Sequence, residues 1–235
     1  MNDRYVLALG YFDGIHLGHL ALLRRAVQRA GELQCRSAVI TFDVHPDTLV
    51  HSCAVPLINH DADRVELIRQ LSGIENVYFI PFTRDTMQTH WRDFLVTLEM
   101  HCATAGYVVG HDFRFGHRGE GNGEKLRQYG MENDLSVDVI DAVTVDGRIA
   151  SSTHVRELLA AGDIERANRM LGHPHRLTGR AEAGLLPWPA ELQTLPEGRY
   201  AVSINGGRAV AAATKEGLIL PEHTGDVTIE FYSAL

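Results

Sequence analysis

The sequence is poor in cysteine and tryptophan and has no long apolar run. Its three cysteines, Cys35, Cys53 and Cys102, are odd in number and far apart, so they form neither a disulfide framework nor a C-x-x-C pair. No run approaches the roughly 18 apolar residues that a membrane helix needs. The first residues, MNDRYVLALGYFDG, show no basic leader followed by an apolar segment. We therefore expect a cytoplasmic protein with no membrane partner.

Positive charge is also scarce. Lysine and arginine number 22 against 30 aspartate and glutamate residues, and no basic block interleaved with aromatic residues occurs. Nucleic-acid interfaces depend on such basic surfaces, so we expect no nucleic-acid partner. The sequence indicates no particular oligomeric state.

Apolar, β-branched runs alternate with helix-period segments over the first 140 residues. The expected strands are Val6–Leu9, Ser37–Phe42, Val77–Ile80, Tyr107–Val109 and Val137–Ile140. The first four read as strands buried on both faces. The expected helices lie at 18–30, 63–71, 89–101 and 123–133. This alternation predicts an α/β fold, in which a parallel sheet carries helices on both faces.

The composition changes in the last third of the chain. Two helices are expected at 153–161 and 163–171, and residues 176–235 are rich in Gly, Pro, Thr and short alternating runs such as Tyr200–Ile204 and Val227–Phe231. We predict two domains, 1–175 and 176–235, the second a small and mostly antiparallel β module. A piece of about 60 residues is marginal alone, so this module is expected to pack on the first domain.

The segment GYFDGIHLGH, residues 10–19, follows the first expected strand and leads into a helix. Ligands of parallel sheets bind at the carboxyl ends of the strands, and helix starts attract anions. Gly10, Phe12, Asp13 and Gly18 are therefore predicted to bind a nucleotide. His16 and His19 are three residues apart, so in helical geometry both could donate to phosphate oxygens. The alternative makes Asp13 a turn residue and the histidines incidental surface groups.

A second anion-binding pattern is SSTHVR at residues 151–156. Ser151, Ser152 and Thr153 are candidates for capping a helix whose first turn carries Arg156. Hydroxyl donors, a helix start and a guanidinium together suit a polyphosphate. The alternative is an ordinary cap beside an exposed arginine.

Polar and aromatic residues also follow other strands. His45 and Pro46 come after the second, and GHDFRFG, with Asp112, Phe113 and Phe115, comes after the fourth. We predict that these five residues bind a second substrate, which the nucleotide would react with. The two phenylalanines could equally pack in the core or stack on a flat ring.

Five motifs in this order resemble the nucleotidyltransferase part of the bacterial FAD synthetase family, the bifunctional riboflavin kinases/FMN adenylyltransferases. The motifs, over about residues 1–180, are GYFDGIHLGH, TFDVHP, VVGHDFRFG, SSTHVRELLAAGDIERANRMLG and HPHRLTG. The resemblance implies a Rossmann-like fold and transfer of AMP from ATP to FMN, with Mg²⁺ accompanying ATP. It also implies that the catalytic residues are His16, His19 and Arg156, that Ser152 and Thr153 help to hold the ATP phosphates, and that Asp112 lines the substrate cleft. No protein ligand of Mg²⁺ is indicated.

The chain departs from the family pattern in several places. Tyr11, Val44 and His111 replace residues usual in the family, and none of the three is a presumed phosphate ligand. Residues 176–235 contain no Pro-Thr-Ala-Asn motif of a riboflavin kinase, and the chain ends at Leu235. The glutamates there are Glu182, Glu191, Glu197, Glu216, Glu222 and Glu230. We expect a degenerate kinase-like remnant without riboflavin kinase activity.

Three alternatives stay open. The chain could adenylylate or cytidylylate another phosphorylated metabolite, because H-x-G-H identifies only the class of nucleotidyltransferases. It could be a metal hydrolase that uses His16 and His19 with His45 or Asp13. It could also be a flavin-nucleotide-binding protein without catalysis.

We predict that His16→Ala and His19→Ala each lower turnover far more than they lower the free energy of unfolding. Removal of one donor to developing negative charge costs on the order of 10²–10³ in rate. Steady-state kinetics and urea unfolding of both variants provide the measurement. Near-normal rates in both would contradict the assignment.

Overall fold

The computed structural model describes residues 4–50, 54–221 and 223–235, so Cys53 and Glu222 lie outside the described residues. The chain forms two compact units and passes between them more than once. The first unit contains Met1–Phe12, Gly18–Ala54 and Val65–Val143, and the second contains Asp13–Leu17, Val55–Arg64 and Thr144–Leu235. The predicted domain boundary at residue 175 stays a prediction, since a compact unit is not a functional domain by definition.

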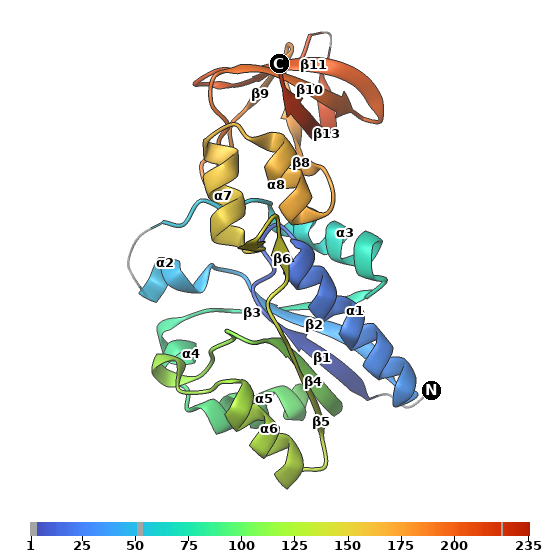
Figure 1. The fold of residues 1–235 in the computed structure, drawn as a ribbon. Coiled ribbons are helices and arrows are strands. Elements are labelled where there is room, and N and C mark those ends of the chain that lie inside the picture. The colour runs from blue at the N-terminus through green and yellow to red at the C-terminus, as the bar shows by residue number, and fades with distance from the viewer. Residues whose placement is uncertain (1–3, 51–53, 222) are drawn as a thin grey trace. The chain divides into compact units, whose positions relative to one another are not determined.

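A five-stranded parallel sheet forms the centre of the first unit (Figure 1). Its strand order is β3-β2-β1-β4-β5. The strands are β1 (Tyr5–Leu9), β2 (Arg36–Phe42), β3 (Asn76–Ile80), β4 (Thr104–Gly110) and β5 (Ser136–Ile140). The predicted strands and their parallel arrangement are therefore confirmed.

One detail of the strand prediction is wrong. Strands β1, β2 and β4 carry consecutive buried residues, but β3 is only partly buried and its Tyr78 is 40% exposed. The reason is its position: β3 pairs only with β2 and forms an edge of the sheet. Its apolar run resembled a central strand because sequence alone does not report the number of neighbours.

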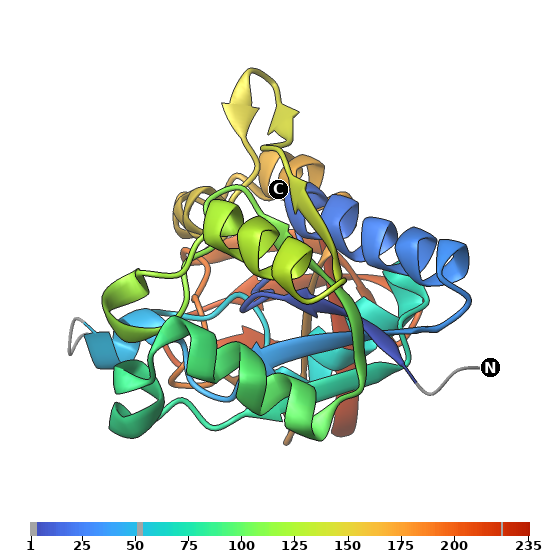
Figure 2. The same ribbon diagram turned by 90° about the horizontal axis from the view of Figure 1, so that it is seen from below.

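Helices cover both faces of the sheet. The four predicted helices are present as α1 (Leu17–Glu32), α3 (Asp61–Ser72), α5 (Trp91–His101) and α6 (Gly123–Glu132). Leu7 and Leu9 of β1 pack in one cluster with Leu95 of α5 and Leu126 of α6. Figure 2 shows α1 on the opposite side of β1 and β2 from α5.

Three short helical segments were not predicted. They are α2 (Pro46–Val50), α4 (Arg84–Gln88) and a 3₁₀ turn at His117–Gly119. Each is too short to show a helical period in its sequence. Helix α4 begins with a capping box in which Thr83 and Thr86 bond reciprocally.

The second unit combines two helices with an antiparallel sheet. Helices α7 (Ser152–Ala160) and α8 (Ile164–Leu171) match the prediction, and Asp163 caps α8. The six-stranded sheet has the order β8-β13-β10-β11-β12-β9. Its strands are β8 (His175–Ala181), β9 (Leu185–Pro187), β10 (Gly198–Ile204), β11 (Gly207–Ala213), β12 (Gly217–Ile219) and β13 (Gly225–Ala234). The predicted antiparallel β module is confirmed.

Segments 13–17 and 55–64 belong to the second unit although they come early in the sequence. Leu57 forms an isolated parallel bridge with Leu192, and Ile58 packs in a core cluster with Val155 and Leu171. A hairpin of β6 (Thr144–Val145) and β7 (Arg148–Ile149) precedes α7. No helix within the described ranges is both long and apolar enough to cross a bilayer.

Candidate functional site

The segment between β1 and α1 has a strained backbone. Phe12, Gly14 and Ile15 have φ angles of 59°, 79° and 46°. Glycine adopts such left-handed angles freely, but a β-branched isoleucine does so only when its surroundings impose them. Each non-glycine residue in such a conformation costs about 1–3 kcal/mol, and such residues cluster at ligand sites. The shape of this loop is therefore enforced by its contacts.

Within the second unit, the Asp13 carboxylate is the centre of those contacts. Asp13 is 1% exposed and accepts hydrogen bonds from the backbone amides of Ile58 (2.9 Å) and Asn59 (3.3 Å). Arg156 Nη1 donates to it at 3.1 Å. Burial raises the pKa of the Asp13 carboxyl above its ordinary value, while the two amides and the guanidinium oppose the rise. Asp13 thus joins three separate chain segments.

The predicted phosphate-binding residues of α7 lie close to Asp13. Ser152 Oγ donates to the Asp13 carbonyl at 2.8 Å. The helix cap is Ser151, one of the three capping candidates, and its hydroxyl accepts from the His154 amide. Thr153 Oγ1 instead accepts from Arg156 Nη2 at 3.4 Å. The structure brings Asp13, Ser152, Thr153 and Arg156 together.

The two histidines of the motif belong to different units. His16, in the second unit, lies one residue before α1, so it is not part of a helical face. It is 7% exposed, and burial lowers its pKa to about 4. A neutral ring at pH 7 can donate one N–H to an anion without carrying charge. His19, in the first unit, lies in the first turn of α1 with its ring centroid 5.2 Å from that of Phe12.

Gly10 and Gly18 have local roles in the first unit. The Gly10 amide donates to the Ile40 carbonyl at 3.3 Å, and a Cβ at Gly10 would lie 3.0 Å from the Phe12 ring. A side chain at position 10 would therefore displace the buried Phe12. Gly18 lies in the first turn of α1.

A cavity of about 1280 Å³ opens in the first unit. Four aromatic rings and three guanidinium groups line it: Phe42, Phe82, Phe94, Phe115, Arg84, Arg114 and Arg118. Many of these residues follow the carboxyl ends of β2, β3 and β4. Aromatic walls with a few convergent cations suit a flat ring system that carries an anionic group.

The five residues predicted to bind the second substrate lie in different surroundings. Pro46 and Phe115 line the cavity, and Phe115 is also a core residue. Phe113 stacks on Phe115 with ring centroids 5.5 Å apart. The His45 ring packs 4.5 Å from that of Tyr11, and the Asp112 side chain is 83% exposed. Binding roles for all five stay predictions.

No binding role was predicted for several cavity residues. Phe82 and Arg84 directly follow β3, and the strand-end rule places them at this edge of the sheet without assigning them a substrate. Phe42 ends β2, and Phe94 lies inside α5. The sequence did not indicate a binding role for Phe94, because a phenylalanine in an amphipathic helix is expected to pack in the core.

The metal-hydrolase alternative finds no ligand set here. Across the residues that the structure describes, no three His, Cys, Asp or Glu side chains are grouped to hold a metal ion. Structural and catalytic zinc sites need at least three protein ligands.

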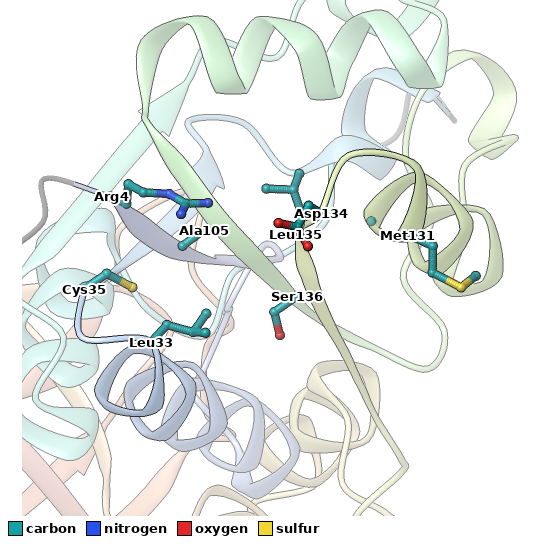
Figure 3. A pocket seen from close by; sticks show the side chains of 9 residues that line it. Arg4, Leu33, Cys35, Ala105, Met131, Asp134, Leu135 and Ser136 are labelled. Carbon is teal, nitrogen blue, oxygen red and sulfur yellow. The ribbon is translucent and has the colours of Figure 1, made fainter.

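A smaller cavity of about 500 Å³ lies at the opposite, amino-terminal edge of the sheet (Figure 3). Arg4, Cys35 and Ser136, close to the starts of β1, β2 and β5, contribute to its lining. The Arg4 guanidinium donates to the Thr104 carbonyl at 3.3 and 3.1 Å. None of the predicted site residues lines this cavity.

The parallel sheet with helices on both faces is a Rossmann-like fold, with a strained turn after its first strand. The sequence profile of FAD synthetase matches residues 1–154, and the chain belongs to the FAD synthetase family.

Curated relatives agree with this assignment, and one solved structure shares the fold. The bifunctional riboflavin kinase/FMN adenylyltransferase of Listeria monocytogenes is 33% identical over 180 residues, which cover 74% of this chain and 55% of that protein. The Pseudomonas fluorescens protein of the same name is 32% identical, covering 76% of this chain and 58% of its own length. This chain thus spans little more than half the length of these relatives. A crystal structure titled macrolide-efflux protein, from Streptococcus pneumoniae, shares the fold, with a TM-score of 0.87 at 23% identity over 100% of this chain and 95% of that one.

The buried His16 predicts an acid-sensitive fold. An unfolded histidine binds a proton below pH 6.5 and the folded one only below about 4, so stability is full above pH 6.5 and is lost as the pH falls toward 4. Between pH 7.5 and 5 this amounts to about 2 kcal/mol. We measure the free energy of unfolding in urea at both pH values. Between pH 7.5 and pH 5 we expect it to fall by about 2 kcal/mol less in His16→Gln than in the native chain.

The matched control is His101→Gln at an exposed position of α5. It should show the same difference between the two pH values as the native chain. An equal pH dependence in His16→Gln and the native chain would contradict the assignment.

Proposed function

We propose that this protein is an ATP-dependent FMN adenylyltransferase, which transfers AMP from ATP to FMN and releases FAD and pyrophosphate. The cavity of the first unit carries the proposal. Its four phenylalanines suit a flat isoalloxazine ring, and its three arginines suit the phosphate of FMN. Membership of the FAD synthetase family, and the names of the curated relatives, support this reading.

The reaction is an in-line attack of an FMN phosphate oxygen on the α-phosphorus of ATP. The attacking oxygen is already ionised near pH 7, so the chain needs no strong general base. Positioning and charge stabilisation then dominate the catalysis. In this proposal the neutral His16, together with His19, donates to the phosphate oxygens, while Arg156 supplies positive charge.

Magnesium would enter as part of the substrate, bound to ATP. Asp13 is the carboxylate nearest to the loop in sequence, but its oxygens already accept from Ile58, Asn59 and Arg156. The described residues also offer no three-ligand group. Phosphate oxygens would therefore supply most of its ligands, as is usual for Mg²⁺ with nucleotides, and the ion would neutralise charge on the leaving pyrophosphate. We further propose a cytoplasmic location, on the sequence features given above.

The test is a product assay with purified protein, ATP, Mg²⁺ and a panel of phosphorylated acceptors that includes FMN. We expect FAD and pyrophosphate from FMN, and no FMN from riboflavin plus ATP, because residues 176–235 lack the kinase motif. Chromatography separates all three flavins. Adenylylation of another acceptor in preference to FMN would replace the proposed substrate, and binding of ATP and FMN without turnover would indicate a sensor. FMN formed from riboflavin at a comparable rate would contradict the kinase prediction.

Arg156→Lys should weaken the binding of ATP more than that of FMN. Lysine keeps the charge but loses the fork that reaches both Asp13 and Thr153. Loss of one charge-assisted hydrogen bond corresponds to roughly tenfold or more in affinity. Calorimetric titration with a non-hydrolysable ATP analogue and with FMN measures both. Arg166→Lys on α8, whose side chain is 65% exposed, is the control; unchanged ATP affinity in Arg156→Lys would oppose the role.

A further inference from the structure

A strained turn carries Arg118 at the wall of the large cavity of the first unit. Arg118 has φ and ψ angles of 52° and 26°, a left-handed conformation that arginine seldom adopts. Its neighbours Gly116 and Gly119 also have left-handed φ angles, of 74° and 66°. Glycine adopts such angles at no steric cost, and the turn has it at two of these three positions. The third position carries a guanidinium group instead.

Contacts with the start of α5 hold this turn in place. The His117 amide donates to the Thr89 carbonyl at 2.7 Å. Gly116 packs so closely on the helix that a Cβ there would lie 2.6 Å from Trp91 Cα. A strained residue persists only where its surroundings impose its conformation, and such residues cluster at ligand sites. The fold therefore determines where the backbone of Arg118 lies.

The cavity gathers positive charge in an acidic chain. The net charge of the chain is −8, yet Arg84, Arg114 and Arg118 all line this cavity. Asp47 supplies the single carboxylate among the described residues of the lining. Within the described part of the chain, none of the three guanidinium groups forms an ion pair. An unpaired arginine at a cavity wall can give its planar fork of N–H groups to a phosphate.

The three arginines differ in the backbone that carries them. Arg84 begins the short helix α4, and Arg114 lies in the loop after β4. Neither of them is among the described residues with left-handed backbone angles. A glycine at position 118 would meet the demands of the turn without strain, so the turn does not explain the arginine. An anion bound in the cavity would explain it.

We propose that Arg118 determines the specificity of the acceptor site: its guanidinium binds the phosphate of FMN and makes the cavity select a phosphorylated flavin over riboflavin. This inference rests on the proposed function and assigns to one residue the choice between two flavins that share the same ring. The phenylalanines of the cavity would contact that ring in both flavins, so they do not distinguish them. A phosphate offers several charged oxygens to a forked donor, whereas the terminal hydroxyl of riboflavin carries no charge.

The binding test compares Arg118→Gly with Arg118→Lys by calorimetric titration of FMN and of riboflavin. Glycine removes the guanidinium and relieves the strain, whereas lysine keeps the charge and loses the fork. We expect FMN to bind at least tenfold more weakly to Arg118→Gly, as the loss of one charge-assisted hydrogen bond requires. The affinity for riboflavin should stay that of the native chain. Arg118→Lys should bind FMN with an affinity between those of the native chain and Arg118→Gly.

The matched control is Gln34→Gly in the turn after α1. Gln34 is exposed and has a φ angle of 53°, so glycine relieves the same kind of strain at a position that does not line the cavity. We expect both glycine variants to melt at or above the melting temperature of the native chain, and Gln34→Gly to bind FMN with native affinity. A lower melting temperature in Arg118→Gly alone would mean that this side chain supports the turn, and would overturn the inference.

The titrations need no turnover, so the inference and the proposed function can fail separately. If no FAD is formed but Arg118→Gly loses the preference for FMN over riboflavin, the proposed reaction fails and the specificity role stands. If FAD is formed but Arg118→Gly binds FMN with native affinity, the proposed reaction stands and the role fails. An equal loss of affinity for FMN and riboflavin would also overturn the role, because Arg118 would then act on the shared ring. So would an equal loss for FMN and a non-hydrolysable ATP analogue, because Arg118 would then serve the nucleotide.

Discussion

The buried Asp13 carboxylate is the interaction on which the candidate site depends. A carboxylate 1% exposed would cost several kcal/mol if it lacked partners, and here the amides of Ile58 and Asn59 and the guanidinium of Arg156 offset that cost. These partners come from positions 45 to 143 residues away in sequence. One short side chain therefore fixes the entrance of the loop, the segment 55–64 and helix α7 at once.

Periodicity predicted the fold well because the strands and long helices of this chain bury regular faces. Periodicity did not predict the short helices α2 and α4 or the edge position of β3, because none of them leaves a periodic signal in the sequence. For the site, residue types at a strand end pointed to Asp13, and those at a helix start pointed to Ser152 and Arg156. Their anchoring by Ile58 and Asn59 could not be predicted, because the contacts use backbone amides, which any residue provides.

The residues of the proposed function are divided between the two units. The first contains the aromatic cavity with Arg84, Arg114 and Arg118, and the second contains the anchored loop with Ser152, Thr153 and Arg156. The arginine of the second unit is held in place by other side chains. Arg156 is bonded to Asp13 and Thr153, so its direction is already set before any anion arrives. A preset donor loses less conformational entropy on binding than a mobile one.

At Ile15, the stability of the fold and the shape of the loop required by the proposed function oppose each other. A fully buried, β-branched residue with a φ angle of 46° lowers the stability of the folded chain, whereas glycine would adopt that angle without strain. Selection for heat resistance alone would favour variants that relax this turn. Such variants would also change the shape of the loop that carries Asp13 and His16, so the proposed site would be preserved only if position 15 were kept fixed during the selection.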